Sequence, residues 1–516
     1  MGDARFSFTD VEKEKSKSWF DSGIFCFLFY GTLMDSTTWG PSTMAADDGA
    51  SRPTLHTWLS SLAEAHGVRV HESLEFRETT HSGRGLFASG DIQKGQVLLS
   101  VPKSLLLSVQ DGAGMSLPPD GAWPRVRAGV ASQYPDSGKT WECVLSRAVV
   151  DAVAGDGGEF WVQYGGVMPP PEALALPFLI PDDELNSLQD PKLAEVAIVT
   201  RARIAALMPD LLEPVGVSGD DNETNEKNET IPAKQPDVSK SVAAWALALV
   251  RSRCMLAGSV QGGGNARAIV PFIDLANHAS IPNADYRCDG VEMNVDGVGA
   301  QEDKNAFQLV CIKKVNKNEE ITLAYTKGEG TSRDHFAQYG FVPNGGYARD
   351  RVPLGPSSDE KATRAIEGKT ATRLLGSLKL KLKHELISET ETDKPSTASW
   401  VAAGGFLSGL FGGGTTHNAN SVPMTDNEET MTLNALRNRI DELENGWATS
   451  LADDEKESAD VAARVSLRRS QSSSTTSEHS LDERLLNVLG LRLNKKRLLA
   501  KVKELLRDVD LDVMSA

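Results

Sequence analysis

The pattern of hydrophobic and polar positions divides the chain into a leader, a mixed segment and a charged helical segment. Residues 1–50 show no sustained period and are predicted to form a poorly ordered leader. A short helix is predicted after Pro53, with Gly67 as its stop. Four apolar residues would share one face of this helix: Leu55, Trp58, Leu59 and Leu62.

Short strands separated by turns are predicted for residues 82–108. The turns are expected at Ser82-Gly83, Gly90-Asp91 and Lys94-Gly95, and Pro102 should end the last apolar strand.

Residues 120 to 265 then have a mostly helical pattern, which includes "SVAAWALALVRSRCML". Residues 217–241 interrupt this pattern with almost no apolar side chains and are predicted to be a mobile loop.

Strands are predicted again for "AIVPFIDLANH" and for two runs around a Lys317-Asn318 turn. After residue 350 the chain becomes charged and helical, with leucines at the spacing of a helical bundle. Polar breaks at 388–430 and 468–480 are predicted to be disordered. The whole pattern predicts an α+β protein whose C-terminal part is mainly α-helical.

Composition narrows the class of protein. The chain has 516 residues, 40% of them hydrophobic, which allows two or three domains with a sizeable core. A net charge of -17 argues against nucleic-acid binding through bulk electrostatics. The 5 cysteines include no CxxC pair and the 9 histidines no HxxxH or HExxH, so no metal site is predicted. We expect an intracellular, reducing compartment such as the cytoplasm, nucleus or plastid.

Membrane insertion is not predicted, because no segment approaches the roughly 20 apolar residues of a membrane span. The apolar run from Gly23 to Met34 follows a lysine-rich stretch, so it fits a targeting segment, a stray apolar tail or a mis-assigned start.

Four short motifs are candidates for chemistry, although each has a plain structural explanation. The glycines of "SGRGLFA" suit close backbone contact with a ligand or a simple hairpin. The "NHASIPN" segment suits a capping turn. Its His278 and Ser280, together with the preceding Asp274, also give the residue types of a hydrolase triad, but without a nucleophile elbow. Tyr325 and Tyr339 close or follow apolar runs and fit a core.

Taken in order, "GRGLFA", "DLANHASIPN", "EEITLAY" and "YGF" resemble the motifs of SET-domain methyltransferases. The long interval between the first two motifs resembles the Rubisco large-subunit lysine methyltransferase subfamily, which has a helical insertion inside the SET fold. The resemblance implies a SET domain over 51–350 with its insertion at about 120–265. Residues 351–516 would be the helical substrate-binding domain of that subfamily.

The resemblance also implies S-adenosylmethionine as cofactor and a protein lysine as substrate. The implied cofactor-binding residues are Gly83, Arg84, Gly85, Arg253, Asp274, Asn277 and His278. A turn at Gly83–Gly85 would offer backbone groups, and Arg253 is preferred to Arg251 for the cofactor carboxylate.

For the reaction itself, the resemblance implies that Tyr325 orients the amine without acting as a general base. The implied walls of the lysine channel are Tyr286, Tyr339 and Phe341.

Two features of the sequence depart from the family pattern. No cysteine-rich zinc cluster follows "YGF", in contrast to many histone-directed members, so we expect a non-histone substrate. Ser332 stands where relatives often have Asn. Histidine methylation and an inactive SET scaffold that binds a protein partner remain alternatives. We expect a monomer.

Overall fold

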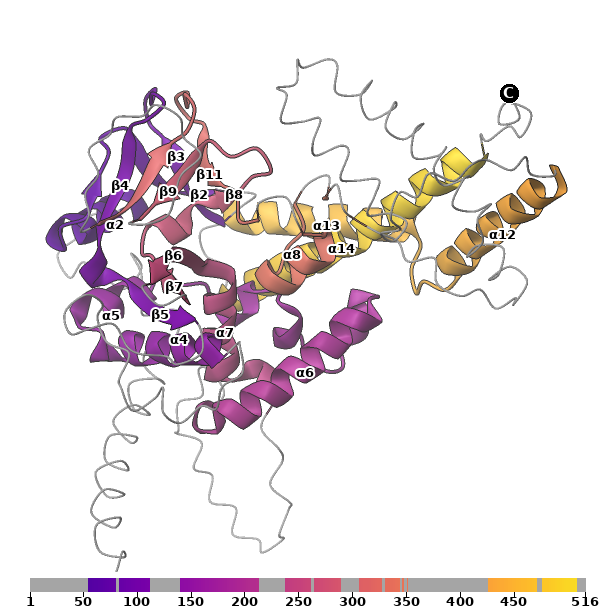
Figure 1. The fold of residues 1–516 in the computed structure, drawn as a ribbon, viewed down its shortest axis with the longest axis horizontal. Helices are drawn as coiled ribbons and strands as arrows, with labels where there is room; N and C mark the ends of the chain where they lie inside the picture. The colour runs from indigo at the N-terminus through magenta and orange to yellow at the C-terminus, as the bar shows by residue number, and fades with distance from the viewer. Residues whose placement is uncertain are drawn as a thin grey trace, which may run out of the picture. The chain divides into compact units, whose positions relative to one another are not determined.

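The computed structural model describes 54–79, 83–111, 140–212, 237–260, 264–288, 306–326, 330–343, 346–347, 350, 426–470 and 476–507 (Figure 1). These residues belong to two compact units. The first unit runs to Leu174 and resumes from Ile198 to Leu323, and the second contains Ala175–Ala197 and the chain from Ala324. The predicted leader, its apolar run and most of the polar loop at 217–241 lie outside the described residues, as does most of the break at 388–430.

Three small sheets form the β part of the first unit. The first has the order β1-β4-β10-β9, all antiparallel: Arg69–Val70, Val97–Pro102, Ala306–Cys311 and Ala284–Arg287. The second has the order β2-β3-β11-β8: Leu74–Thr79, Gly83–Ala88, Glu320–Leu323 and Asn277–His278. The third has the order β5-β7-β6: Leu107–Asp111, Gly264–Ile269 and Cys254–Val260. In the second sheet β8 and β11 are parallel, which brings two distant motifs side by side.

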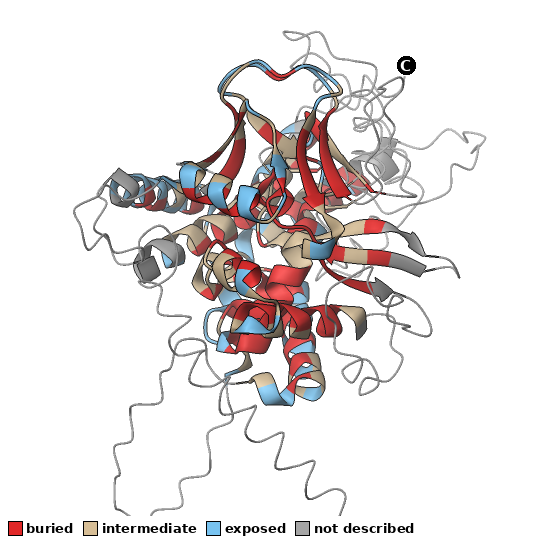
Figure 2. Ribbon diagram, turned by 90° about the vertical axis from the view of Figure 1, so that its left-hand side faces the viewer, coloured by how far each residue is buried: buried red, intermediate tan, exposed pale blue. Residues whose placement is uncertain are grey.

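Helices account for the rest of the first unit. They are α2, α4, α5 and α7: Leu55–Ala65, Thr140–Asp151, Glu159–Gly165 and Val242–Arg253. A π-helical turn, η2, spans Ala152–Asp156. Short 3-10 turns are η1, η3, η6, η7 and η8: Lys103–Leu105, Pro171–Ala173, Pro209–Leu211, Val238–Lys240 and Ile273–Leu275. Every residue of α7 from Val242 to Val250 is buried, as expected for a helix that is apolar on all sides (Figure 2).

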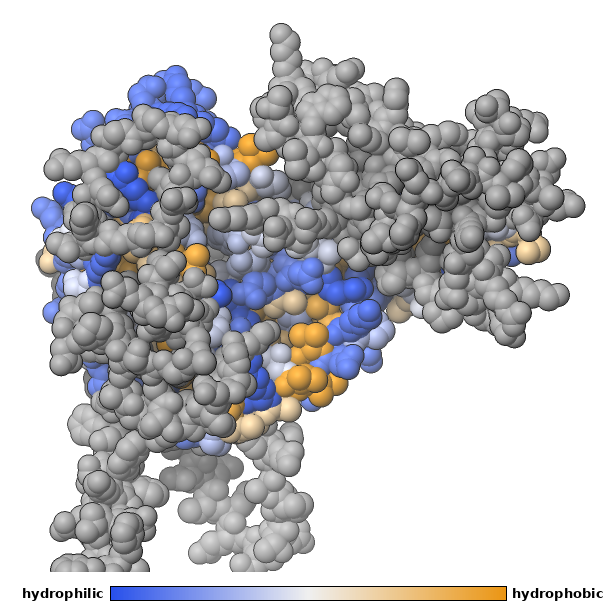
Figure 3. All heavy atoms as spheres, in the orientation of Figure 1, coloured by the Kyte–Doolittle hydropathy of each residue, from blue (hydrophilic) through white to orange (hydrophobic). Residues whose placement is uncertain are grey.

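Helix α6, Pro191–Leu207, begins in the second unit and continues into the first. Its buried positions follow a helical period that includes Leu193, Ala197 and Ile204. Val196, Ile198 and Val199 are exposed, and apolar atoms gather along this helix in Figure 3.

The second unit consists of helices and turns. Its helices α8, α12, α13 and α14 span Ser332–Tyr339, Asp426–Asn445, Leu451–Ser470 and Thr476–Arg507. Two 3-10 turns, η4 and η5, span Pro177–Leu179 and Leu185–Leu188. Helix α14 contacts α8, α12 and α13, and Val461, Val465 and Leu489 form a core between α13 and α14. None of the helices that the structure describes has both the length and the hydropathy of a membrane span.

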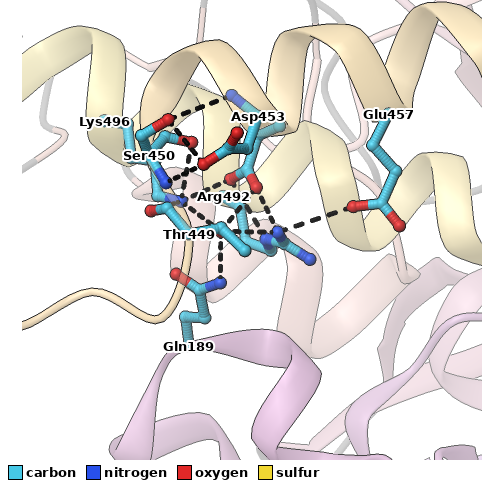
Figure 4. Close-up of polar contacts among 8 residues, drawn as sticks. Gln189, Thr449, Ser450, Asp453, Glu457, Arg492 and Lys496 are labelled. Carbon is cyan, nitrogen blue, oxygen red and sulfur yellow. Dashed lines mark hydrogen bonds and ion pairs between the residues drawn. The ribbon is translucent and has the colours of Figure 1, made fainter.

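A buried ion cluster joins α13 to α14 (Figure 4). The Asp454 carboxylate accepts hydrogen bonds from Lys496 Nζ at 2.6 Å and from Arg492 Nε at 3.1 Å. Lys496 is only 2% exposed and also donates to the Thr449 carbonyl at 2.6 Å. Its charge is therefore compensated by acceptors from the loop that precedes α13.

The sequence pattern predicts the element types well. The expected helix after Pro53 is α2, with Trp58, Leu59 and Leu62 buried and Gly67 at a φ of +73° beyond its end. The two strands around Lys317-Asn318 are β10 and β11, and Asn318 has a φ of +69°. The α+β class and the helical C-terminal part are confirmed.

Four local predictions are wrong. Residues Gly83–Gly85 do not form a turn, because they begin strand β3 and pair with β2. Cys254–Val260 is strand β6, although the apolar pattern continued the helix to residue 256. The predicted strand from 268 to 278 contains the turn η8. The predicted breaks are shorter than expected, because α12 begins at Asp426, α13 reaches Ser470 and α14 begins at Thr476.

Candidate active site

Asn277 lies at the junction of three strands of the second sheet. Its backbone pairs with Thr322 in the parallel ladder between β8 and β11. Its side-chain Nδ2 donates to the Arg84 carbonyl in β3 at 3.0 Å and to Glu320 Oε1 in β11 at 2.8 Å. Both N–H bonds are used, so the side chain offers its Oδ1 as an acceptor. The sheet therefore fixes the orientation of this amide.

Gly85 makes this arrangement possible. A Cβ atom at this position would lie 2.8 Å from Glu320 Oε1 and 3.0 Å from Asn277 Nδ2. Such contacts are too short, so a Cβ atom here would force the carboxylate or the amide to shift from its place against β3. The glycine is needed for side-chain approach in a strand, and not for a turn.

Arg84 directs its side chain to a different segment. Its Nη1 donates to the Val167 carbonyl at 2.6 Å, and its Nε lies 3.5 Å from Glu78 Oε1. Arg84 thus attaches the segment after α5 to β3, while its own carbonyl holds Asn277.

Asn283 shapes the segment after "NHASIP". It is 3% exposed, and its Nδ2 donates to the Glu320 carbonyl at 2.6 Å. Its Oδ1 accepts from Thr322 N at 2.8 Å. One side chain therefore replaces two missing backbone bonds at the edge of β11.

Asp274 is buried in η8 and interacts with protein groups. Arg253 Nη1 donates to its Oδ2 at 3.2 Å and to its carbonyl at 3.0 Å. Burial raises the pKa of Asp274 above its ordinary value, against the lowering effect of the Arg253 charge. Arg251 has a different partner, since its Nη2 lies 3.0 Å from Glu142 Oε2. Of the two arginines, Arg253 is the one beside the "DLANH" motif.

His278 is half-buried in β8, where its backbone pairs with Leu323. Burial lowers the pKa of its ring below 6.5, so the ring is neutral at neutral pH. A neutral ring is not a general acid at this pH, which agrees with the interpretation of His278 as a wall residue.

Tyr286 lies on strand β9 of the first sheet. Its ring stacks on Phe307 with centroids 5.2 Å apart. Burial raises the pKa of its phenol above its ordinary value. Tyr286 therefore packs against the neighbouring strand β10 of the first sheet.

An aromatic cluster in the second unit contains the other three tyrosine and phenylalanine candidates. The ring of Tyr325 lies 5.0 Å from that of Tyr339 and 6.4 Å from that of Phe341, centroid to centroid. Tyr339 donates its hydroxyl to the Tyr325 carbonyl at 3.1 Å. The structure thus brings together three residues that the sequence resemblance assigned to one reaction.

His335 completes this cluster. It is 1% exposed, its ring centroid lies 4.5 Å from that of Tyr339, and its Nδ1 donates to the Phe341 carbonyl at 3.0 Å. The segment around it is held by Ser332, whose backbone N and hydroxyl both donate to Asp350 at 2.5 Å. Asn494 of α14 donates to the same carboxylate at 2.9 Å.

Sequence reasoning missed Glu320, Tyr164 and His335 as site residues. Glu320 could have been suspected from its place in "EEITLAY", but its contact with Asn277 spans 43 residues of sequence. Tyr164 and His335 have no sequence signal beyond their aromatic type. Among the described residues, no group of three or more His, Cys, Asp or Glu side chains could hold a metal ion.

Comparison with known families identifies the domain. The family model of the SET domain matches residues 83–326. This part of the chain is therefore a SET domain, as the four motifs predicted. The comparison with curated proteins gives no match.

Several solved structures are similar to the chain. One is the structure of Rubisco LSMT bound to AdoMet, with 16% identity, a TM-score of 0.45, and coverage of 89% of this chain and 94% of the other. The SET domain of LSMT bound to lysine and AdoHcy gives the same values. LSMT bound to sinefungin and monomethyllysine has 15% identity and a TM-score of 0.44, covering 88% of this chain and 92% of the other.

Proposed function

We propose that this protein is an S-adenosylmethionine-dependent protein-lysine N-methyltransferase. The observation that carries the proposal is the locked amide of Asn277 within a SET domain. One backbone carbonyl and one carboxylate of the sheet orient this amide through its two N–H groups. The Oδ1 of Asn277 can then accept a hydrogen bond from an ammonium group of a ligand. The family match supports methyl transfer to a protein, and lysine is the finer part of the proposal.

The residues of the first unit fit the methionine end of the cofactor. That end carries an ammonium group, which suits the acceptor Oδ1 of Asn277, and a carboxylate, which suits a guanidinium. Arg253 supplies such a guanidinium beside the same motif. The backbone of Gly83–Gly85, with His278 and the buried Asp274, is proposed to complete this binding region.

When bound, S-adenosylmethionine supplies an activated methyl group on a positively charged sulfur. The remaining work is alignment, because an in-line displacement gains much of its rate from fixed geometry. Tyr325 is proposed to orient the lysine amine by hydrogen bonding. Its carbonyl is held by Tyr339, which restrains this part of the backbone.

The substrate amine must reach the reaction without its proton. A lysine has a pKa of about 10.4 in water, and an apolar environment lowers it. The aromatic rings of Tyr339 and Phe341 are proposed to provide that environment, with Tyr286 as a further wall residue. No strong base is required of the protein, because desolvation already favours the neutral amine.

The alternatives concern the substrate and the activity. A histidine side chain is a second candidate acceptor, and the choice depends on the residues that line the channel. An inactive scaffold is disfavoured, because such a protein has no need for the steric fit of Gly85 against Asn277. A non-histone protein substrate and a monomeric state remain predictions.

Calorimetry with S-adenosylmethionine tests the cofactor part of the proposal. The folded full-length protein should bind one equivalent, and Asn277→Ala should weaken binding by about tenfold or more. Absence of binding to folded wild-type protein would contradict the proposal.

A further inference from the structure

A buried chain of hydrogen bonds runs from Tyr164 through Asp274 to Arg253. Tyr164 in α5 is fully buried, and its hydroxyl donates to Asp274 Oδ1 at 2.5 Å. The Asp274 side chain is 1% exposed and receives Arg253 Nη1 on its other oxygen at 3.2 Å. Three distant parts of the first unit, α5, α7 and η8, therefore meet in one charged contact.

Tyr164 also stabilises the backbone that presents Asp274. Phe272 is buried and has a φ of +67°, which is costly for a residue with a large side chain. Its N–H donates to the Tyr164 hydroxyl at 2.8 Å. The same hydroxyl thus accepts from the strained residue and donates to the carboxylate two positions later, which fixes the direction of that carboxylate.

Arg253 uses only part of its donor set within this network. Its Nη1 bonds to both the carboxylate and the carbonyl of Asp274. Its Nε is buried and has no hydrogen-bond partner among the described residues. A buried donor without a partner is costly, and the Nε–Nη2 edge of a guanidinium matches the two oxygens of a carboxylate. The Arg253 side chain as a whole is 20% exposed, although its Nε is buried.

We infer that Tyr164 and Asp274 are positioning residues that hold Arg253 so that its Nε–Nη2 edge receives the carboxylate of the methionine part of the cofactor. This inference rests on the proposed function. Asp274 neutralises the arginine on one side and sets its plane, and Tyr164 sets the direction of Asp274. Neither residue needs to touch the ligand.

The test compares two ligands that differ only in the carboxylate. Calorimetry is carried out on the full-length protein with S-adenosylhomocysteine and with its decarboxylated analogue, in which hydrogen replaces the carboxylate. Tyr164→Phe should weaken the binding of S-adenosylhomocysteine by about tenfold and change the affinity for the analogue by less than about twofold. Arg253→Ala should abolish the preference for the carboxylate, and adding Tyr164→Phe to it should have no further effect on that preference.

Trp161→Phe is the matched control. Its ring contacts that of Tyr164 at 5.7 Å without joining the hydrogen-bond chain, so it reproduces a packing change alone. It should leave the ratio of the two affinities unchanged.

Two results would overturn the inference. One is an equal loss of affinity for both ligands in Tyr164→Phe, which would indicate a merely structural role. The other is an unchanged affinity for both ligands in that variant. If Tyr164→Phe does not fold, the Arg253→Ala ratio decides alone, and an unchanged ratio rejects the inference. Failure of the wild-type protein to bind either ligand would instead contradict the proposed function.

Discussion

At position 85 a single methyl group decides whether the proposed cofactor site can form. A Cβ atom on Gly85 would meet Glu320 and Asn277, the two side chains that define the orientation of the amide. Neither partner can move away without weakening the part-buried hydrogen bond between them.

Gly85→Ala should therefore weaken S-adenosylmethionine binding by about tenfold or more while the protein remains folded. Gly90→Ala is a matched control, because its Cβ would meet the hydroxyl end of Ser73 at 3.2 Å, away from Asn277. Calorimetry on both variants measures the effect. Equal affinities for the two variants would show that the fit at Gly85 does not matter for the cofactor.

Tyr325→Phe isolates the hydroxyl that the proposal assigns to the amine. It should lower the rate of methyl transfer to a confirmed substrate by about a hundredfold, since positioned hydrogen bonds contribute effects of this order. Cofactor affinity should stay within about twofold, because the ring and its contacts with Tyr339 are kept. Full-rate methylation by this variant would refute the assigned role.

Candidate residues could be predicted where a motif is continuous in sequence. The "NH" pair and the glycines of "GRG" could be recognised in the sequence, because the family motifs that they match are short and contiguous. Glu320 and Tyr164 could not, because their roles arise from a parallel strand pair and from a contact across 110 residues. Asp274 was found by its motif, but its full burial and its Tyr164 partner have no signal in sequence.

At the scale of elements, Asp190 connects the N-terminus of α6 to two helices of the second unit, α8 and α14. Its Oδ1 accepts from Lys192 N at 3.1 Å, as an N-cap of α6. Its Oδ2 accepts from Arg333 of α8 at 2.8 Å and from Lys495 of α14. Burial raises the pKa of Asp190, but its bonds to Lys495 and Arg333 outweigh this, so the pKa lies below its ordinary value.

This lowered pKa predicts a pH-dependent contribution to stability. The stabilisation from Asp190 is fully present above its unfolded pKa of about 3.9 and is lost as the pH falls through the lower folded value. Asp190→Asn should reduce the free energy of unfolding by about 3 kcal/mol at pH 6. The difference from wild type should shrink below about pH 4. Denaturant unfolding across this range measures it, and a difference that grows on acidification would contradict the account.

The ion cluster between α13 and α14 predicts a larger effect. Asp454→Ala should destabilise the protein by about 3 to 5 kcal/mol, because it leaves the buried charges of Lys496 and Arg492 without their carboxylate. Asp453→Ala is the neighbouring control, since that carboxylate only caps the helix through Ser450 at 2.7 Å and should cost about 1 kcal/mol. Similar losses in the two variants, measured by denaturant unfolding, would reject the role of the cluster.

The periodicity of the sequence predicted the types of most helices and strands. It did not predict where α7 gives way to β6, or that η8 interrupts a predicted strand. The apolar run of α7 passes into β6 at Cys254 without a glycine or proline, so the pattern gives no signal for the end of the helix. Because both elements are buried, the sequence lacks the polar positions that would distinguish them: a helix that is apolar on all sides and a buried strand have similar sequences. At 273–275 a strand was predicted, but Ile273, Asp274 and Leu275 form a 3-10 turn.

At the scale of the whole molecule, the chain combines a SET domain at 83–326 with a helical C-terminal segment. The domain limits predicted from sequence, 51–350 and 351–516, stay predictions. The central claim is that these parts together methylate a protein lysine.

The most direct test of that claim is transfer of a radiolabelled methyl group from S-adenosylmethionine into a cell lysate by the full-length protein, with mass spectrometry to locate the label. We predict label on the side-chain nitrogen of a lysine in a protein, and a strong reduction of that label with Tyr325→Phe. Label on histidine would contradict the lysine assignment. No transfer by folded, cofactor-binding protein into lysate that contains its natural partners would contradict the enzymatic claim itself.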